Sequence, residues 1–459
     1  MKKKNIRDFK AEKIITFIAD VVILLVLGLA AFFLFPNEKI GPRDSAALNI
    51  LFALVAVCFM YWLEKYETFI SELGEKRVIT VLSFLYTFLV FGAINLLLFM
   101  ETDRLINDAF LFAAGLVAVL IKDRILHVIM NKRFVTPRLL IVGAASAELI
   151  RMKRVRYGVH DFYETWYETL EGIAESDVAD YIKGLLEDYE GICIFNDFSD
   201  AVYDTLVNVA TDMNKDIYII PKIVDVGKIN ARIVRFDDIL SLHLKKYHVT
   251  GIELFIKRFM DIVISLVMTL FAALPMLVIA LLIKLTSPGP VFYKQQRLTK
   301  DKKIFWIYKF RTMIPDAEKH TGPVFAQKDD PRITPIGKIL RSMRLDELPQ
   351  LLNILKGDMS VVGPRPERPE FVELFSGQIR NYDYRFKLKA GLTSLSHIYG
   401  RYSTQIYDRT YYDLYYIARY SLLLDLKIML LTSKTMFLKD AAEGVETVGV
   451  NNAKELSLK

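Results

Sequence analysis

Long stretches without a charged residue constrain this chain more than any other feature of its sequence. A helix needs about 20 apolar residues to cross the hydrocarbon core of a bilayer. Residues 262–283 are 22 uncharged residues in succession, and further apolar runs occupy 14–35, 45–63, 78–100 and 109–121, the first interrupted only by Asp20. The mean hydropathy of +0.27 indicates a membrane protein, and 25% charged residues require that part of the chain folds in water.

The first four runs predict a four-helix transmembrane bundle over residues 1–133. The first run follows a basic N-terminus, but it is long and ends in Phe35-Pro36 without a small-residue cleavage pattern, which indicates a retained helix rather than a signal peptide. The fourth run is short and needs residues 125–130 to cross; a buried soluble helix is the alternative. Segments rich in Lys and Arg alternate along the chain with segments that contain few of them, and the basic segments of a membrane protein usually lie in the cytosol. The N-terminus and everything after Arg133 are therefore expected in the cytosol.

Residues 134–240 have the pattern of a soluble α/β domain. Apolar strands are expected at 138–142, 191–195 and 216–220, with helical periodicity at 178–189 and 200–213 between them. Strands that alternate with helices predict a parallel, Rossmann-like sheet. The turn at 143–148 lacks the glycines of GxGxxG, so the backbone cannot approach a pyrophosphate closely. We expect a degenerate nucleotide fold with a structural or regulatory role.

The apolar run at 262–283 is predicted to enter the membrane and return. Pro275 lies in its middle, where it removes a backbone hydrogen bond and kinks the helix. Both flanks are basic, whereas a crossing helix should show a charge asymmetry. We therefore expect a re-entrant helix over 258–285, with a kinked transmembrane span as the alternative.

The remaining composition excludes several classes of protein. The net charge of +7 is modest, and no nucleic-acid-binding motif accompanies it. The two cysteines, Cys58 and Cys193, lie far apart and form no CxxC pattern, and the six histidines are scattered. Disulfide frameworks and Cys/His metal sites are therefore not expected.

The residues best suited to chemistry lie between 287 and 399, where Pro, Gly, Arg and Asp are dense. Asp346 and Glu347 precede Pro349, which is tolerated only in a first helical turn, so the acidic pair is expected at a helix start. Arginines nearby suit phosphate oxygens, and adjacent carboxylates can bind Mg²⁺ or act as a covalent nucleophile. An ordinary acidic helix cap with surface arginines explains these residues equally well on their own.

A resemblance decides between these interpretations. Six ordered motifs make the region from about 257 to 437 resemble the bacterial sugar transferase domain of monotopic phosphoglycosyl transferases: KRFMD (257–261), SPGPVF (287–292), KFRTM (309–313), DPRITPIG (330–337), DELPQ (346–350) and GPRPE (363–367). With its N-terminal spans and α/β domain, the whole chain resembles the large members, which start exopolysaccharide, capsule or O-antigen assembly on undecaprenyl phosphate. The resemblance implies a mostly α catalytic domain over 250–438.

The resemblance also assigns roles to particular residues. It implies that Asp346 attacks the β-phosphorus of a UDP-sugar in the presence of Mg²⁺, releases UMP and carries the phosphosugar until undecaprenyl phosphate accepts it. Glu347 would assist as a base or metal neighbour, and Arg365 and Glu367 would bind substrate. Ser394 and His397 depart from the family pattern of Gly and Gln, which bears on sugar or nucleotide preference.

Charge and position alone assign three more residues, Arg311, Arg332 and Arg344, to substrate phosphates. The complete prediction is a multi-pass enzyme of the bacterial inner (cytoplasmic) membrane with a cytosolic catalytic domain and a disordered tail at 439–459. Its expected partners are a UDP-sugar, undecaprenyl phosphate and the bilayer, with no nucleic acid; a homo-oligomer stays open. A non-catalytic scaffold or regulator of polysaccharide assembly is the alternative, and a polytopic metal-dependent prenol-phosphate enzyme would need more spans.

Overall fold

The computed structural model forms two compact units, Met1–Lys222 and Ile223–Lys459. The residues that the structure describes are 5–6, 9–36, 40–67, 73–135, 137–143, 164–195, 198–221, 225–226, 228, 231–236, 239–243, 249–315, 330–399 and 406–437. The predicted tail at 439–459 and most of the turn at 143–148 lie outside them.

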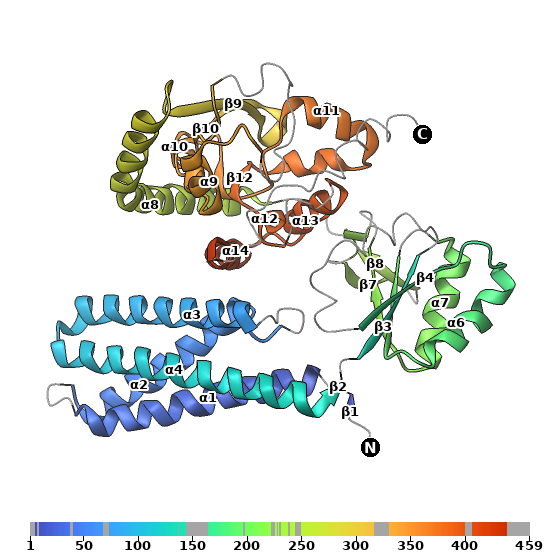
Figure 1. Cartoon of the computed structure of the whole chain (residues 1–459), viewed down its shortest axis with the longest axis horizontal. Helices are drawn as coiled ribbons and strands as arrows, with labels where there is room; N and C mark the ends of the chain where they lie inside the picture. The colour runs from blue at the N-terminus through green and yellow to red at the C-terminus, as the bar shows by residue number, and fades with distance from the viewer. Residues whose placement is uncertain are drawn as a thin grey trace. The chain divides into compact units, whose positions relative to one another are not determined.

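Long apolar helices build the N-terminal part of the first unit (Figure 1): α1 (Phe9–Leu34), α2 (Pro42–Trp62), α3 (Leu73–Ile94) and α4 (Thr102–Arg133). Each of these helices packs against its neighbours in sequence, and α4 also packs against α1. A Cβ on Gly115 would lie 2.6 Å from the Phe84 ring, so this glycine permits the close approach of α3 and α4.

The N-terminal helices carry the membrane signal as predicted. Among the described residues, five helices are long and apolar enough to cross a membrane, these four and α8 (Gly251–Thr286). The fourth run and its continuation form a single helix, α4. Between α3 and α4, the Asn95 side chain donates to the Glu101 carbonyl at 2.8 Å and accepts from its N–H at 3.1 Å, which stabilises the turn.

A buried ionic cluster explains why charged residues occur inside these apolar helices. Lys65 lies 3.1 Å from both Asp20 and Asp123, and Lys122 lies 2.7 Å from Asp20. The side chains of Lys65 and Asp20 are fully buried. Two acids and two lysines neutralise each other, as charges inside a membrane protein must.

The α/β region contains a parallel sheet of four described strands in the order β4-β3-β5-β6. The three apolar strands expected from the sequence are present as β3 (Arg138–Gly143), β5 (Gly191–Ile194) and β6 (Asp216–Ile219). β4 (Glu164–Thr169) was not expected, because its sequence ETWYET mixes polar and aromatic residues at a sheet edge. Helices α6 (Val178–Leu186) and α7 (Asp200–Asp212) pack apolar faces around Leu140 and Ile192.

The second unit combines short strands with helices. Its strands form three two-stranded sheets within the described residues: the antiparallel hairpins β7 (Arg232–Phe236) with β8 (Ile239–His243) and β9 (Phe292–Leu298) with β10 (Ile304–Phe310), and parallel β11 (Ser360–Val362) with β12 (Gly391–Thr393). Its helices after α8 are α9 (Pro335–Ser342), α10 (Gln350–Lys356), α11 (Pro369–Gln378), α12 (Leu395–Ile398), α13 (Ile406–Ala418) and α14 (Leu422–Phe437).

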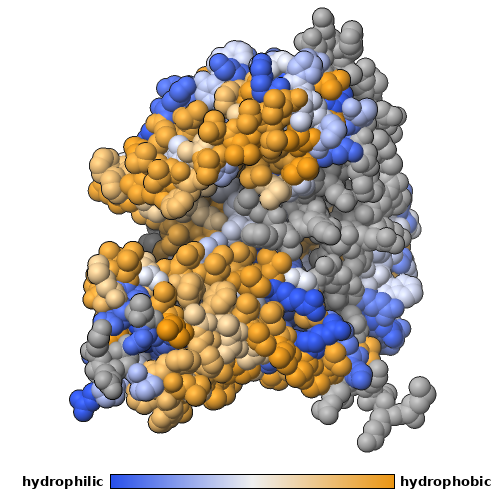
Figure 2. Space-filling model, turned by 60° about the vertical axis from the view of Figure 1, so that its left-hand side comes forward, coloured by the Kyte–Doolittle hydropathy of each residue, from blue (hydrophilic) through white to orange (hydrophobic). Residues whose placement is uncertain are grey.

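Helix α8 begins with a capping box between Thr250 and Glu253 and contains Pro275. Figure 1 shows that α8 bends, so that its two halves run in different directions. Its middle exposes large apolar side chains: Leu270 and Phe271 are 76% exposed and Leu274 is 70% exposed. Such surface needs a non-aqueous environment, and Figure 2 shows broad hydrophobic surfaces of this kind.

Charged residues fasten the first half of α8 to the rest of the second unit. Lys257 Nζ donates to Asp425 Oδ2 on α14 at 2.7 Å, and Asp261 Oδ1 accepts from Val361 N–H on β11 at 2.9 Å. Arg258 donates from Nη1 and Nη2 to the carbonyls of residues 354 and 355 at 2.6 and 2.9 Å. These carbonyls lie at the C-terminal end of α10, so α8 and α10 are joined directly.

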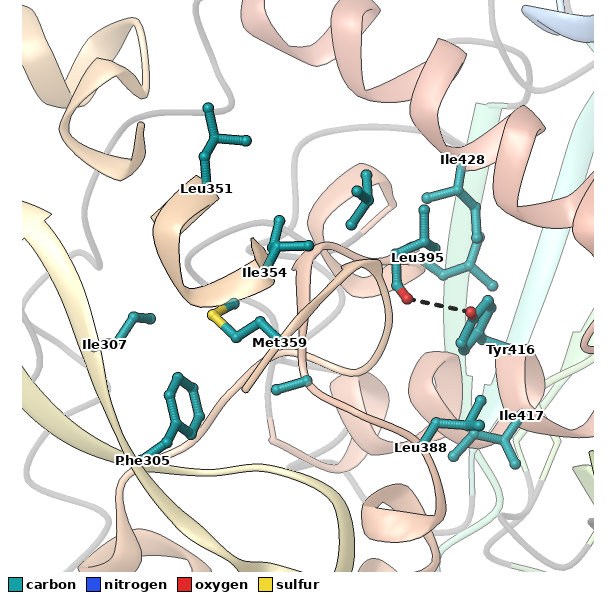
Figure 3. Packing of buried hydrophobic residues seen from close by; sticks show 13 residues of the cluster. Phe305, Ile307, Leu351, Ile354, Met359, Leu388, Leu395, Tyr416, Ile417 and Ile428 are labelled. Atoms are coloured by element: carbon teal, nitrogen blue, oxygen red, sulfur yellow. Dashed lines mark hydrogen bonds between the residues drawn. The ribbon is translucent and has the colours of Figure 1, made fainter. Parts of the chain in front are cut away.

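The main core of the second unit gathers side chains from distant segments (Figure 3). Phe305 and Ile307 of β10 meet Leu351 and Ile354 of α10, and further residues come from β11, α12, α13 and α14. The buried Tyr416 hydroxyl donates to Asp425 Oδ1 at 2.7 Å and lies 3.4 Å from the Val362 carbonyl. This core fixes α10, and therefore the turn that precedes it, against β10.

Candidate active site

The acidic pair lies in a short 3-10 turn, η6 (Leu345–Glu347), immediately before α10. The sequence predicted that the pair would stand at a helix start; the regular helix begins three residues after Glu347, at Gln350. Arg344 precedes the turn in a left-handed conformation with φ 54°, and Pro349 stands directly before α10. The turn directs Asp346 into the unit, where the residue is only 8% exposed.

Glu347 is held by a lysine of the neighbouring hairpin. Lys309 Nζ on β10 donates to Glu347 Oε1 at 2.6 Å. Burial alone would raise the pKa of Glu347, but the charges of Lys309 and Arg365 outweigh it and lower that pKa to about 2. Glu347 is therefore an anion at every physiological pH, paired with Lys309.

Asp346 has the opposite electrostatic character. Burial raises the pKa of its carboxyl to about 6, and the adjacent Glu347 charge also raises it, against the opposing charges of Lys309 and Arg341. The group is ionised above pH 6 and is more basic than an ordinary aspartate. Two neighbouring acids with pKa values driven apart are typical of sites where each acid has a separate role.

The predicted arginines divide into two groups. Arg344 and Arg365 lie close enough to Glu347 for their charges to lower its pKa, so the structure brings them together with the acidic pair. Arg311 instead donates from Nη2 and Nη1 to the Ser287 and Pro288 carbonyls at 2.8 and 2.7 Å. It therefore fixes the turn that ends α8.

Two further predicted substrate residues also have partners within the protein. Arg332 donates from Nη2 and Nε to its neighbour Asp330 at 2.6 and 2.9 Å. Glu367, only 4% exposed, faces Arg297 at 3.8 Å. Substrate contacts by these residues and by Arg311 stay predictions, whereas their contacts in the structure fix loops.

A buried network behind the Arg365 loop was missed by the sequence analysis. Arg385 Nη2 donates both to the Arg365 carbonyl at 2.9 Å and to Asp413 Oδ2 at 2.5 Å. The Ser396 hydroxyl donates to the other Asp413 oxygen at 3.2 Å. Arg385 and Asp413 are each 1% exposed. No local pattern marks these residues, because each finds its partner only in the folded chain.

The donor set around the acidic pair fits a metal ion only in part. Within the described residues, no group of three or more His, Cys, Asp or Glu side chains could hold a metal ion. Mg²⁺, however, commonly takes one or two carboxylates and completes its shell with substrate phosphates and water. Asp346 and Glu347 suit that arrangement, in which the substrate supplies the remaining oxygens.

Comparison with known proteins identifies the family. A family model described as bacterial sugar transferase matches residues 252–439. A UDP-glucose:undecaprenyl-phosphate glucose-1-phosphate transferase of Escherichia coli is 32% identical, and the alignment covers 68% of this chain and 69% of the relative.

Two other relatives match over shorter stretches. A UDP-N-acetylgalactosamine-undecaprenyl-phosphate N-acetylgalactosaminephosphotransferase of Aeromonas hydrophila is 42% identical over 44% of this chain and 48% of its own length. A UDP-glucose:undecaprenyl-phosphate glucose-1-phosphate transferase of Klebsiella pneumoniae is 37% identical over 52% of each chain. The matches to these two therefore span about half of each relative. The chain combines long apolar helices with this acidic turn, and it belongs to the bacterial sugar transferase family.

Proposed function

We propose that this protein transfers a sugar 1-phosphate from a UDP-sugar to undecaprenyl phosphate and so starts a bacterial exopolysaccharide, capsule or O-antigen chain. The names of the relatives support this reaction class. The observation that carries the proposal is the buried Asp346, whose raised pKa contrasts with the Lys309-paired Glu347 beside it. Such a pair supplies one nucleophile and one fixed anion.

The reaction proceeds in two displacements at phosphorus. An Asp346 carboxylate oxygen attacks the β-phosphorus of the UDP-sugar, the bond between that phosphorus and the bridging oxygen breaks, and UMP leaves with the electron pair. A phosphate oxygen of undecaprenyl phosphate then attacks the same phosphorus, releases the carboxylate and forms the lipid diphosphate sugar. Arg344 and Arg365 stabilise the phosphate charge, since guanidinium groups bind phosphate oxygens bidentately.

Mg²⁺ belongs to the proposal as a group that Asp346 and Glu347 would hold together with the donor phosphates. When bound, it would neutralise negative charge on those phosphates. Lys309 keeps Glu347 ionised and oriented. Because Asp346 is buried, water is kept away from the covalent intermediate, which it would otherwise hydrolyse in place of the transfer to the acceptor.

A UMP-release assay tests the proposed reaction. The purified full chain is incubated with Mg²⁺ and, in turn, UDP-glucose, UDP-galactose and their N-acetylamino counterparts. With one of them we expect a stoichiometric burst of UMP without acceptor, followed by turnover when undecaprenyl phosphate is added. UMP only when both substrates are present would reject the covalent intermediate. Release of UDP, or of neither nucleotide, would reject the reaction.

The same proposal includes a re-entrant α8 and a cytosolic active site. A straight helix of 36 residues would be about 54 Å long. Yet Arg258 near its start bonds to α10, and the carbonyls just after its end bond to Arg311, which follows β10. Asn353 of α10 in turn bonds to the β10 backbone at 2.7 and 3.0 Å. Both ends of α8 thus contact one folded body, which supports their location on one side of the membrane.

Cysteine labelling tests this topology in a background where Cys58 and Cys193 are replaced by Ser. We expect Arg43→Cys, at the start of α2, to react with a membrane-impermeant maleimide in intact cells. Lys302→Cys, in the 3-10 turn η5 (Lys300–Lys302) beyond α8, should react only after permeabilisation. Equal labelling of both positions in intact cells would mean that α8 crosses the membrane.

A further inference from the structure

The side chain of His397 is buried and polar, and it has no hydrogen-bond partner among the described residues. The residue lies in the short helix α12 and is only 8% exposed. Its backbone N–H donates to the Ser394 side chain at 3.1 Å, which holds the helix turn. Neither ring nitrogen has a hydrogen-bond partner among the described residues. Leaving a buried polar group unpaired is unfavourable, so the imidazole needs a partner that the described residues do not supply.

The segment that carries the imidazole bonds to the Arg365 loop: the Thr393 carbonyl accepts from Gly363 N–H at 3.0 Å, and Ser396 bonds to Asp413, the partner of the Arg385 that donates to the Arg365 carbonyl. Burial and the charges of Arg365, Arg344 and Lys309 keep the pKa of His397 well below its usual value. The same three cations act on Glu347. The two side chains therefore share one set of charged neighbours, and His397 is neutral at physiological pH.

The hydrogen-bonding capacity of a neutral imidazole selects the kind of group that it can bind. One ring nitrogen donates and the other accepts. An ionised phosphate only accepts, and it would leave the accepting nitrogen unpaired; Arg344 and Arg365 serve phosphates better. A hydroxyl group both donates and accepts, so it can pair with whichever ring nitrogen faces the donor; the two nitrogens point away from each other, so one hydroxyl serves only one of them.

The other polar groups on this short helix are already occupied. The Ser394 and Ser396 hydroxyls bond to each other at 2.8 Å, and Ser396 also bonds to Asp413. His397 is thus the side chain of α12 with free hydrogen-bonding capacity among the described residues.

We propose that His397 binds a hydroxyl group of the donor's sugar and thereby sets which sugar the enzyme transfers. The inference rests on the proposed function, because it takes the donor to be a nucleotide sugar. It makes His397 a specificity-determining residue that acts on the part of the donor beyond the phosphates.

Deoxy donors test the inference. For the sugar that the wild type uses best, analogues that each lack one hydroxyl are compared in the wild type, His397→Leu and His397→Gln. We expect His397→Leu to lower kcat/KM for the complete donor about 10- to 100-fold, because the substitution leaves one buried hydroxyl group unpaired. With one particular deoxy donor the two enzymes should differ less than about 3-fold, because the contact is already absent. His397→Gln, whose amide donates and accepts, should retain more activity than His397→Leu.

The controls separate the possible failures. Tyr399→Phe changes a 41% exposed neighbour and should leave kcat/KM unchanged. If the wild type releases no UMP with any donor, the proposed function fails. If the wild type is active but His397→Leu loses the same factor with every deoxy donor, or loses nothing, the inference alone fails. Should His397→Leu not fold, His397→Met, which also cannot replace the contact, takes its place in the deoxy series under the same criterion.

Discussion

Replacing Asp346 by Asn is expected to lower the rate of UMP release by about four orders of magnitude or more, because the amide cannot attack phosphorus. The protein should still insert and fold, since Asn has nearly the same shape as Asp. The matched control is Asp383→Asn, which removes a carboxylate that is 53% exposed and pairs with Lys302 at 2.7 Å on the surface. Residual turnover of Asp346→Asn at a tenth of the wild-type rate would contradict the role of Asp346 as nucleophile.

The same substitution should make the protein more stable at neutral pH. The pKa of Asp346 is about 6 in the folded protein and 3.8 in the reference state, so ionising this group opposes folding at any pH above 6. Removing the charge should therefore stabilise the fold by at most about 3 kcal/mol at pH 7.5. As the pH falls from 6 towards 3.8, Asp346 becomes protonated first in the folded and then in the unfolded protein, and the stability difference between the variant and the wild type should vanish. Thermal unfolding of wild type and variant at pH 7.5 and pH 4 measures this difference.

Asp413→Asn is expected to cause the largest loss of stability. It leaves Arg385 buried and without its counter-ion, and breaking such a pair typically costs about 3–5 kcal/mol. Burial would lower the pKa of Arg385, but the Asp413 charge raises it above its usual value, so the guanidinium stays charged. Activity should also fall, because Arg385 supports the carbonyl of Arg365. Thermal unfolding and kcat/KM measure the two effects.

Two comparisons identify the physical cause. Asp383→Asn removes an exposed ion pair and should change stability by less than about 1 kcal/mol. The double variant Arg385→Met with Asp413→Leu removes both buried charges and should recover much of the stability, though not the support of Arg365. If the double variant is as unstable as Asp413→Asn, an orphaned charge is not the reason for the loss.

The apolar runs predicted the membrane helices well but not their ends. Helix α3 begins at Leu73, five residues before the apolar run at 78–100, because residues such as Glu75 and Lys76 are good helix formers outside the apolar part. Hydropathy therefore marks the membrane portion of a helix rather than its ends. The pairing of Lys65 with Asp20 and Asp123 joins three segments far apart in sequence, and no local pattern could reveal it.

For the site, the sequence identified the acidic pair but not how it is held. Lys309 was visible only as the first residue of the KFRTM motif, and its contact with Glu347 spans 38 positions. Arg311 and Arg332 stay predicted phosphate ligands from their charge and position; the structure adds the contacts that they make within the protein, with backbone carbonyls and with Asp330. A sequence shows that a cation is present; only the fold shows whether the protein itself already uses it.

The two hydrogen bonds from Arg258 to the end of α10 have a consequence for how a hydrophobic and a water-soluble reactant meet. They couple the lipid-facing helix rigidly to the short helix that carries the acidic turn at its other end. If α8 is embedded as proposed, the depth to which it sinks sets the height of Asp346 above the lipid headgroups. The enzyme would then hold the Asp346 carboxylate at the same height as the acceptor's phosphate group. The acceptor could react without leaving its leaflet.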